Sequence, residues 1–268
     1  IKQNKNLFIH APSNWSKESF INVGFDDSQI IVVPHGVNKD NFNIIPSDEK
    51  KNIKKKLKIN DENIVLSNIG AMSENKGIEF LISAYGILKK KYKNLKLILK
   101  DQSNLYGITT NYIFEKIKNS GFNNKFKIIN DEMMKDIIII SKNLNLKEIR
   151  DIYSITDCYI SPYLAEGFNL TPLEAAACGT QVIVTKGGST DDYFDQRLGY
   201  QIESDEIKRE DNSYILSPKI DSLINIIEEK IINKKDNLEI DRSSYVHNNF
   251  SWKQVVYKLK NEFQNKLK

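Results

Sequence analysis

The stretch YISPYLAEGFNLTPLEAAACGTQVIVT, residues 159–185, decides the prediction of the fold. It opens on a short apolar strand, Tyr159–Ser161, and continues in a loop, residues 162–170, that contains proline, glycine and asparagine. A helix over Pro172–Cys178 and a second strand over Val182–Thr185 follow in close order. Two strands joined by one short helix are typical of a parallel βαβ unit.

The start of the predicted helix favours binding of an anion. Thr171 is placed to cap the helix, Pro172 suits the first helical position, and Glu174 stands three residues after the cap, which predicts a capping box. Such a start leaves the backbone N–H groups of residues 168–171 free, and the helix dipole makes them more positive. The helix also follows the carboxyl end of a strand, where open α/β sheets bind ligands. We therefore expect a diphosphate at this helix start.

The rest of the chain repeats this alternation of apolar β-branched runs and helical periodicities, which predicts an α/β fold with a Rossmann-like parallel sheet flanked by helices. The other predicted strands are Leu7–His10, Ile30–Val33, Ile64–Ile69, Leu95–Lys100, Phe126–Ile129 and Ile137–Ile140, and the other predicted helices are Lys17–Asn22, Ile78–Lys91, Thr109–Asn119 and Leu146–Ser154. After Ile202 we expect a charged loop, then a strand near Tyr214, and then helices from Ile220 and from Trp252 to the end.

A linker divides this pattern into two units. The run Pro34–Ser47 holds two prolines and a glycine among polar residues, which is typical of a connection between α/β units. The residues before it form a short β-α-β piece. Because the first residue is isoleucine and not methionine, we expect the chain to be a fragment or a processed product.

Composition and charge argue against several classes of function. The net charge of +4 comes from 39 basic and 35 acidic residues with scattered lysines, so we expect no nucleic-acid partner. The densest run, Lys50–Lys58, is typical of one exposed helix face. Cys158 and Cys178 stand in apolar or small-residue contexts, which favours a reducing cytoplasm over a disulfide framework. No stretch approaches the roughly 20 apolar residues of a membrane-spanning helix.

Two carboxylates flank the predicted helix start, Glu166 in the loop and Glu174 in the first turn. A carboxylate can accept hydrogen bonds from two neighbouring sugar hydroxyls at once. A nucleotide-sugar needs one such group near its ribose and another near the transferred sugar, and the spacing of the two glutamates suits both. The alternatives are that Glu174 only caps the helix and that Glu166 is an ordinary loop residue.

The connected run Glu166-Gly167-Phe168-Asn169-Leu170-Thr171-Pro172-Leu173-Glu174-Ala175, followed by residues 176–183, resembles the Glu-x7-Glu signature of the group 1 family of retaining glycosyltransferases with the GT-B fold. The resemblance implies that Glu174 binds the ribose of the donor and that Glu166 is a catalytic residue in contact with the transferred sugar. It also implies that the backbone amides from Gly167 to Thr171 bind phosphate and sugar.

A second match to this family covers Asn68–Gly77, a predicted strand, loop and helix start. Family members carry an arginine after the first glycine and a lysine before the second, and both cations neutralise the leaving diphosphate. Gly70 and Lys76 are present here, but Ala71 stands where the arginine would be. Loss of one such cation commonly costs a few kcal/mol of transition-state stabilisation. As a hypothesis, Lys100 at the end of the neighbouring strand takes its place; the alternative is an exposed strand-end lysine.

Shorter stretches extend the resemblance over nearly the whole chain. Val33–Asn38 looks like the hinge between the two GT-B domains, and Phe250–Trp252 looks like the start of the closing helix. The loop Gly187–Asp192 either lines the donor pocket or is a simple glycine turn. The implied domains are the end of the N-terminal, acceptor-side domain (1–34), a nucleotide-sugar-binding Rossmann-like domain (35–250) and a C-terminal helix that returns to the first domain (251–268).

The resemblance implies an enzyme that transfers a sugar from a nucleotide-diphosphate donor to a hydroxyl of a glycan, lipid or protein acceptor with retention of anomeric configuration. Because most of the acceptor domain is missing, we expect this chain to bind donor better than it catalyses. Peripheral contact with a membrane would come through the missing domain. The main alternative is a non-catalytic nucleotide-sugar-binding module. An NAD-dependent oxidoreductase is a weaker alternative, because Gly-x-Gly-x-x-Gly is absent.

Neither a metal ion nor another cofactor is expected. The sequence has no Asp-x-Asp motif, and His10, His35 and His247 are too dispersed to suggest a metal site. The charge of the leaving group would then fall to Lys76, as a second catalytic residue beside Glu166, and to the amides of the helix start.

Overall fold

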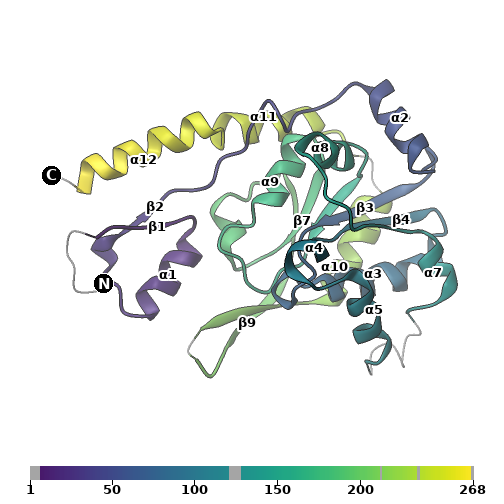
Figure 1. Ribbon diagram of the computed structural model, residues 1–268, viewed down its shortest axis with the longest axis horizontal. Coiled ribbons are helices and arrows are strands. Elements are labelled where there is room, and N and C mark those ends of the chain that lie inside the picture. Colours follow the sequence, from purple (N-terminus) through teal and green to yellow (C-terminus); the bar gives the residue numbers. More distant parts are fainter. Residues whose placement is uncertain (1–6, 121–127, 212, 234–235, 267–268) are drawn as a thin grey trace.

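The centre of the protein is a six-stranded parallel sheet in the computed structural model, which describes residues 7–120, 128–211, 213–233 and 236–266. Its strands are β3 (Ile64–Ile69), β4 (Leu95–Lys100), β5 (Ile137–Ile140), β6 (Cys158–Ser161), β7 (Gln181–Thr185) and β8 (Gly199–Ile202). All neighbouring strands run parallel, and β6 and β7 are buried along their whole length. The predicted α/β fold with a Rossmann-like sheet is confirmed (Figure 1).

The order of the strands, β5-β4-β3-β6-β7-β8, places a topological switch point between β3 and β6. From β3 the chain moves outward to β5, returns to β6 beside β3, and then moves outward in the other direction to β8. The segments that leave the carboxyl ends of β3 and β6 therefore lead to helices on opposite faces of the sheet. A crevice opens between such segments, and open α/β sheets bind their ligands there.

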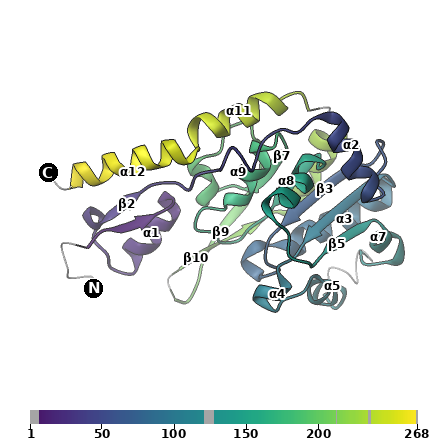
Figure 2. The same cartoon turned by 45° about the horizontal axis from the view of Figure 1, so that its top comes forward.

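Helices cover both faces of the sheet (Figures 1 and 2). The helices α8 (Leu146–Ser154), α9 (Leu170–Ala177) and α11 (Glu239–Asn249) pack their apolar residues into the core on one face. On the other face lie α3 (Ile78–Lys91), α5 (Thr110–Lys118) and α10 (Ile220–Ile226), which continues as a π-helix over Ile227–Ile232. The remaining α-helices that the structure describes in the central domain are α2 (Ser47–Lys56), α4 (Ser103–Tyr106) and α7 (Asp131–Lys135).

The first residues form a small separate unit that the end of the chain joins. β1 (Ile9–Ala11) pairs in parallel with β2 (Ile30–Val32), with α1 (Asn14–Asn22) between them. The last helix, α12 (Trp252–Lys266), lies along this unit in both views (Figures 1 and 2). Val255 of α12 packs in one cluster with residues of β2 and the segment that follows it.

The predicted hinge and the predicted start of the closing helix meet in space. Val37 donates its amide to the carbonyl of Phe250 at 2.7 Å and forms a β-bridge with Ser251. A Cβ at Gly36 would lie 2.8 Å from the Trp252 ring, so only glycine permits this close approach. These contacts join the hinge to the start of the last helix.

The structure differs from the sequence prediction after Ile202. The expected charged loop is wrong over Ser204–Lys208, which forms strand β9 and pairs antiparallel with β10 (Tyr214–Pro218). Its charged residues give no apolar pattern in the sequence, and the strand is held by backbone pairing with β10. β8 was also not predicted. Of the predicted strand Phe126–Ile129, residues 126 and 127 lie outside the described residues, and Ile128 and Ile129 are not in a strand.

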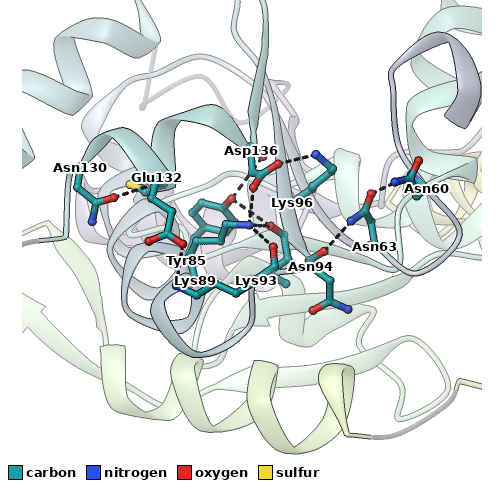
Figure 3. Close-up of polar contacts among 12 residues, drawn as sticks. Asn60, Asn63, Tyr85, Lys89, Lys93, Asn94, Lys96, Asn130, Glu132 and Asp136 are labelled. Carbon is teal, nitrogen blue, oxygen red and sulfur yellow. Dashed lines mark hydrogen bonds and ion pairs between the residues drawn. The ribbon is translucent and has the colours of Figure 1, made fainter.

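A polar cluster lies at the amino-terminal ends of β4 and β5, at the edge of the sheet opposite to the crevice of the switch point (Figure 3). Lys89 of α3 is almost fully buried, and its ammonium contacts the Asp136 carboxylate at 2.6 Å and the carbonyl of Leu95 at 2.9 Å. Lys96 contacts the other oxygen of Asp136 at 2.6 Å. Although burial raises the pKa of Asp136, the bonds from the two lysines bring it below its ordinary value. The charges of this cluster satisfy one another, which indicates a structural role.

We expect a Lys89→Met substitution to reduce the free energy of unfolding by about 2 kcal/mol, because it removes the buried partner of an ion pair while Lys96 still holds Asp136. Urea denaturation followed by circular dichroism measures this change. Lys90→Met on the exposed side of the same helix is the control and should have little effect. A loss no larger than that of the control would contradict the structural role of Lys89.

Candidate functional site

Two loops meet at the carboxyl edge of the switch point, residues 70–77 after β3 and residues 162–169 after β6. Gly77 lets them approach, since its φ is 62° and a Cβ there would lie 1.9 Å from the Pro162 carbonyl oxygen. The Leu164 amide donates to the Asn75 carbonyl at 2.7 Å. The side chain of Asn75 donates in turn to the carbonyl of Ala165 at 3.1 Å. The first loop therefore holds the second by backbone and side-chain contacts.

This contact brings together the two residues that the sequence indicated as catalytic. The Lys76 ammonium lies 2.5 Å from an oxygen of the Glu166 carboxylate, and the two side chains are only 22% and 13% exposed. Asn75 donates to the same carboxylate oxygen at 3.4 Å. Asn75 was not predicted to contribute, although it stands inside the matched run Asn68–Gly77. The one feature of the sequence that could have indicated Asn75 is its position beside Lys76.

The predicted capping box at the start of α9 is wrong. The helix begins at Leu170, its N-cap is Asn169 in the left-handed conformation at φ 62°, and no side chain caps it. Asn169 is held there from outside the helix, because its amide group donates to Ser161 at 2.9 Å and its carbonyl accepts the Tyr193 hydroxyl at 2.8 Å. Asparagine tolerates this conformation better than most residues. Tertiary contacts, and not a local capping motif, determine where the helix starts.

Thr171 has a different role from the predicted cap. Its hydroxyl lies inside the first turn of α9 and accepts a hydrogen bond from the Tyr159 hydroxyl at 2.8 Å. The same Tyr159 hydroxyl contacts the carbonyl of Ile69 at 3.1 Å. The start of α9 is thereby tied to the end of β3 across the switch point.

Glu174 faces a cavity and does not cap the helix. Its carboxylate accepts a hydrogen bond from the Tyr153 hydroxyl at 3.2 Å. Burial raises the pKa of Glu174 to about 7, and the bond from Tyr153 offsets only part of this effect. A carboxyl group that titrates near neutral pH in a crevice is a common feature of binding and catalytic sites. The interpretation of Glu174 as a pure cap is therefore wrong.

The backbone amides of residues 167–171 are open. None of these consecutive N–H groups has an acceptor among the residues that the structure describes. Phe168 and Asn169 are nevertheless buried, and an unsatisfied amide in a buried position is costly. A row of free amides at the positive end of a helix is suited to an anion or to a ligand rich in oxygen. The prediction of free N–H groups at residues 168–171 is therefore confirmed, although α9 begins two residues earlier than expected.

A cavity of about 200 Å³ lies between these groups. It is lined by Ile69, Gly70, Ala71, Lys76, Gln102, Tyr106, Ile149, Tyr153, Thr171 and Glu174. A larger cavity of about 750 Å³ lies at the opposite, amino-terminal edge of the sheet, where Lys50 of its lining already contacts Glu239. We assign the site to the smaller cavity, because it lies at the switch point and is lined by Lys76, Glu174 and Thr171, the last residue of the run of unpaired amides.

Neither of the two positions considered for a second cation, Ala71 and Lys100, places a charge in the cavity lining. The small Ala71 side chain lines the cavity where the family has its arginine, and it brings no charge. Lys100 is buried, does not line the cavity, and donates to the carbonyl of Asp101. Burial lowers the pKa of Lys100, and Asp101 opposes this effect. Lys100 is therefore a buried residue and not an exposed strand-end lysine.

The remaining candidates of the sequence analysis lie apart from the cavity. The loop Gly187–Asp192 contacts Tyr163 and α1, and none of its residues lines the cavity. His10 and His35 lie side by side with ring centroids 6.0 Å apart, and the His35 ring packs edge-on against Phe168 at 5.2 Å. In the described part of the chain no group of three or more histidine, cysteine, aspartate or glutamate side chains could hold a metal ion. Nor does any described helix have the length and apolar character needed to cross a membrane.

The six-stranded parallel sheet with helices on both faces, and a cavity at its switch point, are features of a glycosyltransferase domain of the GT-B fold. The model of the family "Glycosyl transferases group 1" matches residues 49–238, and the chain belongs to this family. Among curated proteins it is similar to the lipopolysaccharide 1,2-N-acetylglucosaminetransferase of Salmonella typhimurium, with 24% identity over 96% of the chain and 62% of the relative.

Solved structures show the same fold. A glycosyltransferase from Rickettsia africae superposes with a TM-score of 0.73 at 19% identity, over 98% of the chain and 64% of that protein. The Anabaena protein Alr3699/HepE, solved in complex with UDP and glucose, also has a TM-score of 0.73, at 17% identity over 96% of the chain and 63% of that protein. The chain thus spans less than two thirds of the length of these relatives.

Proposed function

We propose that this chain is the donor-binding half of an enzyme that transfers a sugar, of the hexose type, from a nucleotide diphosphate to an acceptor hydroxyl with retention of configuration. The observation that carries the proposal is the row of unpaired amides at residues 167–171, which reaches the cavity at Thr171. Glu174 and Lys76 line the same cavity, and Lys76 pairs with Glu166. The bound UDP and glucose of the Anabaena protein support a nucleotide-sugar as the ligand.

Each group has a role that follows from its chemistry. The open amides and the Lys76 ammonium stabilise the negative charge of the diphosphate, which grows as the sugar leaves. The Glu174 carboxylate, once ionised, accepts hydrogen bonds from the ribose hydroxyls. Glu166 contacts hydroxyls of the transferred sugar, and its ion pair with Lys76 orients both side chains before the donor binds.

Ala71 makes Lys76 more important in this chain than in relatives with two cations. Because no second cation lines the cavity among the described residues, Lys76 stands alone there with the amides. We keep Lys100 as a hypothetical second cation, which would have to leave its bond to the Asp101 carbonyl to reach the diphosphate. Donor turnover by a Lys100→Ala variant that equals that of the parent would dismiss this idea.

The remaining parts of the proposal concern the whole protein. The acceptor is a hydroxyl of a glycan, lipid or protein, and it is bound largely by the acceptor-side domain, of which residues 1–34 form the end. We propose a cytoplasmic enzyme that uses neither a metal ion nor a separate cofactor, with membrane contact through the acceptor domain. A non-catalytic nucleotide-sugar-binding module is the second candidate, which Ala71 favours. Formation of a glycosylated product by the full-length protein separates the two.

Nucleotide binding tests the site directly. We expect the full-length protein to bind UDP or GDP in isothermal titration calorimetry, and binding of NAD alone would overturn the assignment. Lys76→Ala should weaken binding of the diphosphate roughly tenfold or more, because it removes a charge-assisted contact, and should leave binding of the corresponding nucleoside unchanged.

The matched control for this experiment is Lys116→Ala. Lys116 pairs with Glu74 and Glu79 near the same loop but does not line the cavity. Its variant should bind the diphosphate as the parent does. An equal loss in both variants would show a general effect of surface charge and would remove Lys76 from the site.

A further inference from the structure

The small amino-terminal unit contacts the loop of residues 162–169, here called the donor loop, through the start of α1. The hydroxyls of Ser13 and Ser16 both donate to the carbonyl oxygen of Gly167, at 2.6 and 2.8 Å. Ser13 is fully buried, and its hydroxyl also caps α1 by accepting the Ser16 amide at 3.1 Å. These residues lie more than 150 positions away in sequence from the glycine that they hold.

A second contact fixes the same helix start. The backbone amide and the side-chain amide of Asn14 both donate to one carboxylate oxygen of Asp192, at 2.7 and 3.0 Å. A carboxylate at the amino end of a helix is stabilised by the helix dipole. The first turn of α1 is therefore attached to the central domain at two places, and it cannot rotate freely about the Gly167 contact.

The contact with Gly167 has a consequence for the next amide. A trans peptide is planar, so its carbonyl and its N–H point in opposite directions, and the chain has no cis peptide among its described residues. The two serine hydroxyls hold the Gly167 carbonyl toward α1, which turns the amide of Phe168 away from α1. That amide belongs to the open row, and the same contact keeps a carbonyl oxygen from turning toward an anionic ligand.

We propose that Ser13 and Ser16 are positioning residues for the donor: they hold the Gly167–Phe168 peptide in the orientation that offers its amide to the diphosphate. The inference rests on the proposed function of the open amides. It makes the affinity for the donor depend on two hydroxyls of the acceptor-side unit. The same contact also restricts the backbone next to Glu166, the residue before Gly167.

The test uses the full-length protein and isothermal titration with UDP, GDP and their nucleosides. Ser16→Ala removes one donor and leaves the cap of α1 intact, so we expect diphosphate binding to weaken about fivefold, as for one hydrogen bond. The double variant Ser13→Ala, Ser16→Ala should weaken it at least tenfold. The double variant Ser13→Thr, Ser16→Thr keeps both hydroxyls and should restore the parental affinity.

The matched control is Ser19→Ala, because Ser19 lies on the same helix and its hydroxyl donates to the carbonyl of Trp15 in that helix. The ratio of diphosphate to nucleoside affinity is the decisive quantity, since a general loss of stability would not change it. An unchanged ratio in the Ser13→Ala, Ser16→Ala protein overturns the positioning role alone. A parent protein that binds none of the nucleotides overturns the proposed function, and the positioning role with it.

Discussion

A Glu174→Gln protein is expected to bind nucleoside diphosphate at least tenfold more weakly than the parent and yet to be more stable at about pH 8. Both effects have one cause, the burial that raises the pKa of Glu174 to about 7. In the proposed donor site the ionised carboxylate would accept hydrogen bonds from both ribose hydroxyls, whereas a glutamine has one oxygen for them. The same ionisation is unfavourable in the empty, buried site, and glutamine avoids it.

The direction of the stability change follows from proton linkage. The folded-state pKa of Glu174 lies above its ordinary value of 4.5, so the folded protein binds more protons between these values. The contribution of Glu174 to stability is fully present below pH 4.5 and is lost as pH rises through about 7. We therefore expect Glu174→Gln to be more stable than the parent by on the order of 2 kcal/mol at about pH 8. The difference should vanish near pH 4.

Urea denaturation of both proteins across this pH range measures the effect, with Glu115→Gln on the exposed part of α5 as the control. Nucleotide titrations across the same range should show an affinity difference that grows with pH. The phosphate of the nucleotide titrates in the same way with the parent and with Glu174→Gln, so the difference in affinity between the two proteins isolates the effect of Glu174. A Glu174→Gln protein with parental affinity would remove Glu174 from the donor site. Global unfolding of the variant would instead favour a structural role.

The second large effect is expected for Arg242→Met. Arg242 is fully buried and donates to the carbonyls of Gly179 at 2.5 Å and Leu198 at 3.1 Å, and it pairs with Asp236 at 2.8 Å. Methionine fills similar space but leaves the carboxylate and both carbonyls without this donor. The Asp236 side chain is 27% exposed, so the cost comes mainly from the buried carbonyls that lose their donor, and it should be about 3 kcal/mol. We expect this loss in the free energy of unfolding.

Arg197→Met is the matched control for Arg242→Met. Arg197 pairs with Asp195 and lies over the Tyr245 ring at 4.3 Å, but its side chain is 49% exposed. Exposed ion pairs contribute little to stability, so its loss should be much smaller. Chemical denaturation of the three proteins under one set of conditions gives the comparison. Equal losses for the two arginines would mean that Arg242 contributes no more than a surface charge.

Most elements of the sheet could be predicted because their signals are local. α3 and α8 have the predicted bounds, since each has a regular apolar periodicity and α8 also begins with a capping box of Asn145 and Glu148. β3 and β4 also have the predicted bounds, because they are mostly apolar runs buried in a parallel sheet. The strand β9 was missed because its charged residues follow no apolar pattern, and only pairing with β10 makes it a strand.

The candidate site shows the same division at the level of single residues. Glu166, Glu174 and Lys76 could be selected from the sequence, because a motif reports residue types and their spacing. The start of α9 could not, because the left-handed conformation of Asn169 depends on Ser161 and Tyr193. These partners come from other segments of the chain, so no local pattern records them.

The sequence by itself determined which residues carry charge and that they follow the ends of strands, because hydrogen-bonding preference and apolar periodicity act over a few neighbouring residues. Only the tertiary structure decided that Lys76 pairs with Glu166, that Tyr153 covers Glu174, and that two serines of α1 hold the donor loop. Burial and ion pairing depend on which distant segments meet, and here the switch in strand order between β3 and β6 makes them meet.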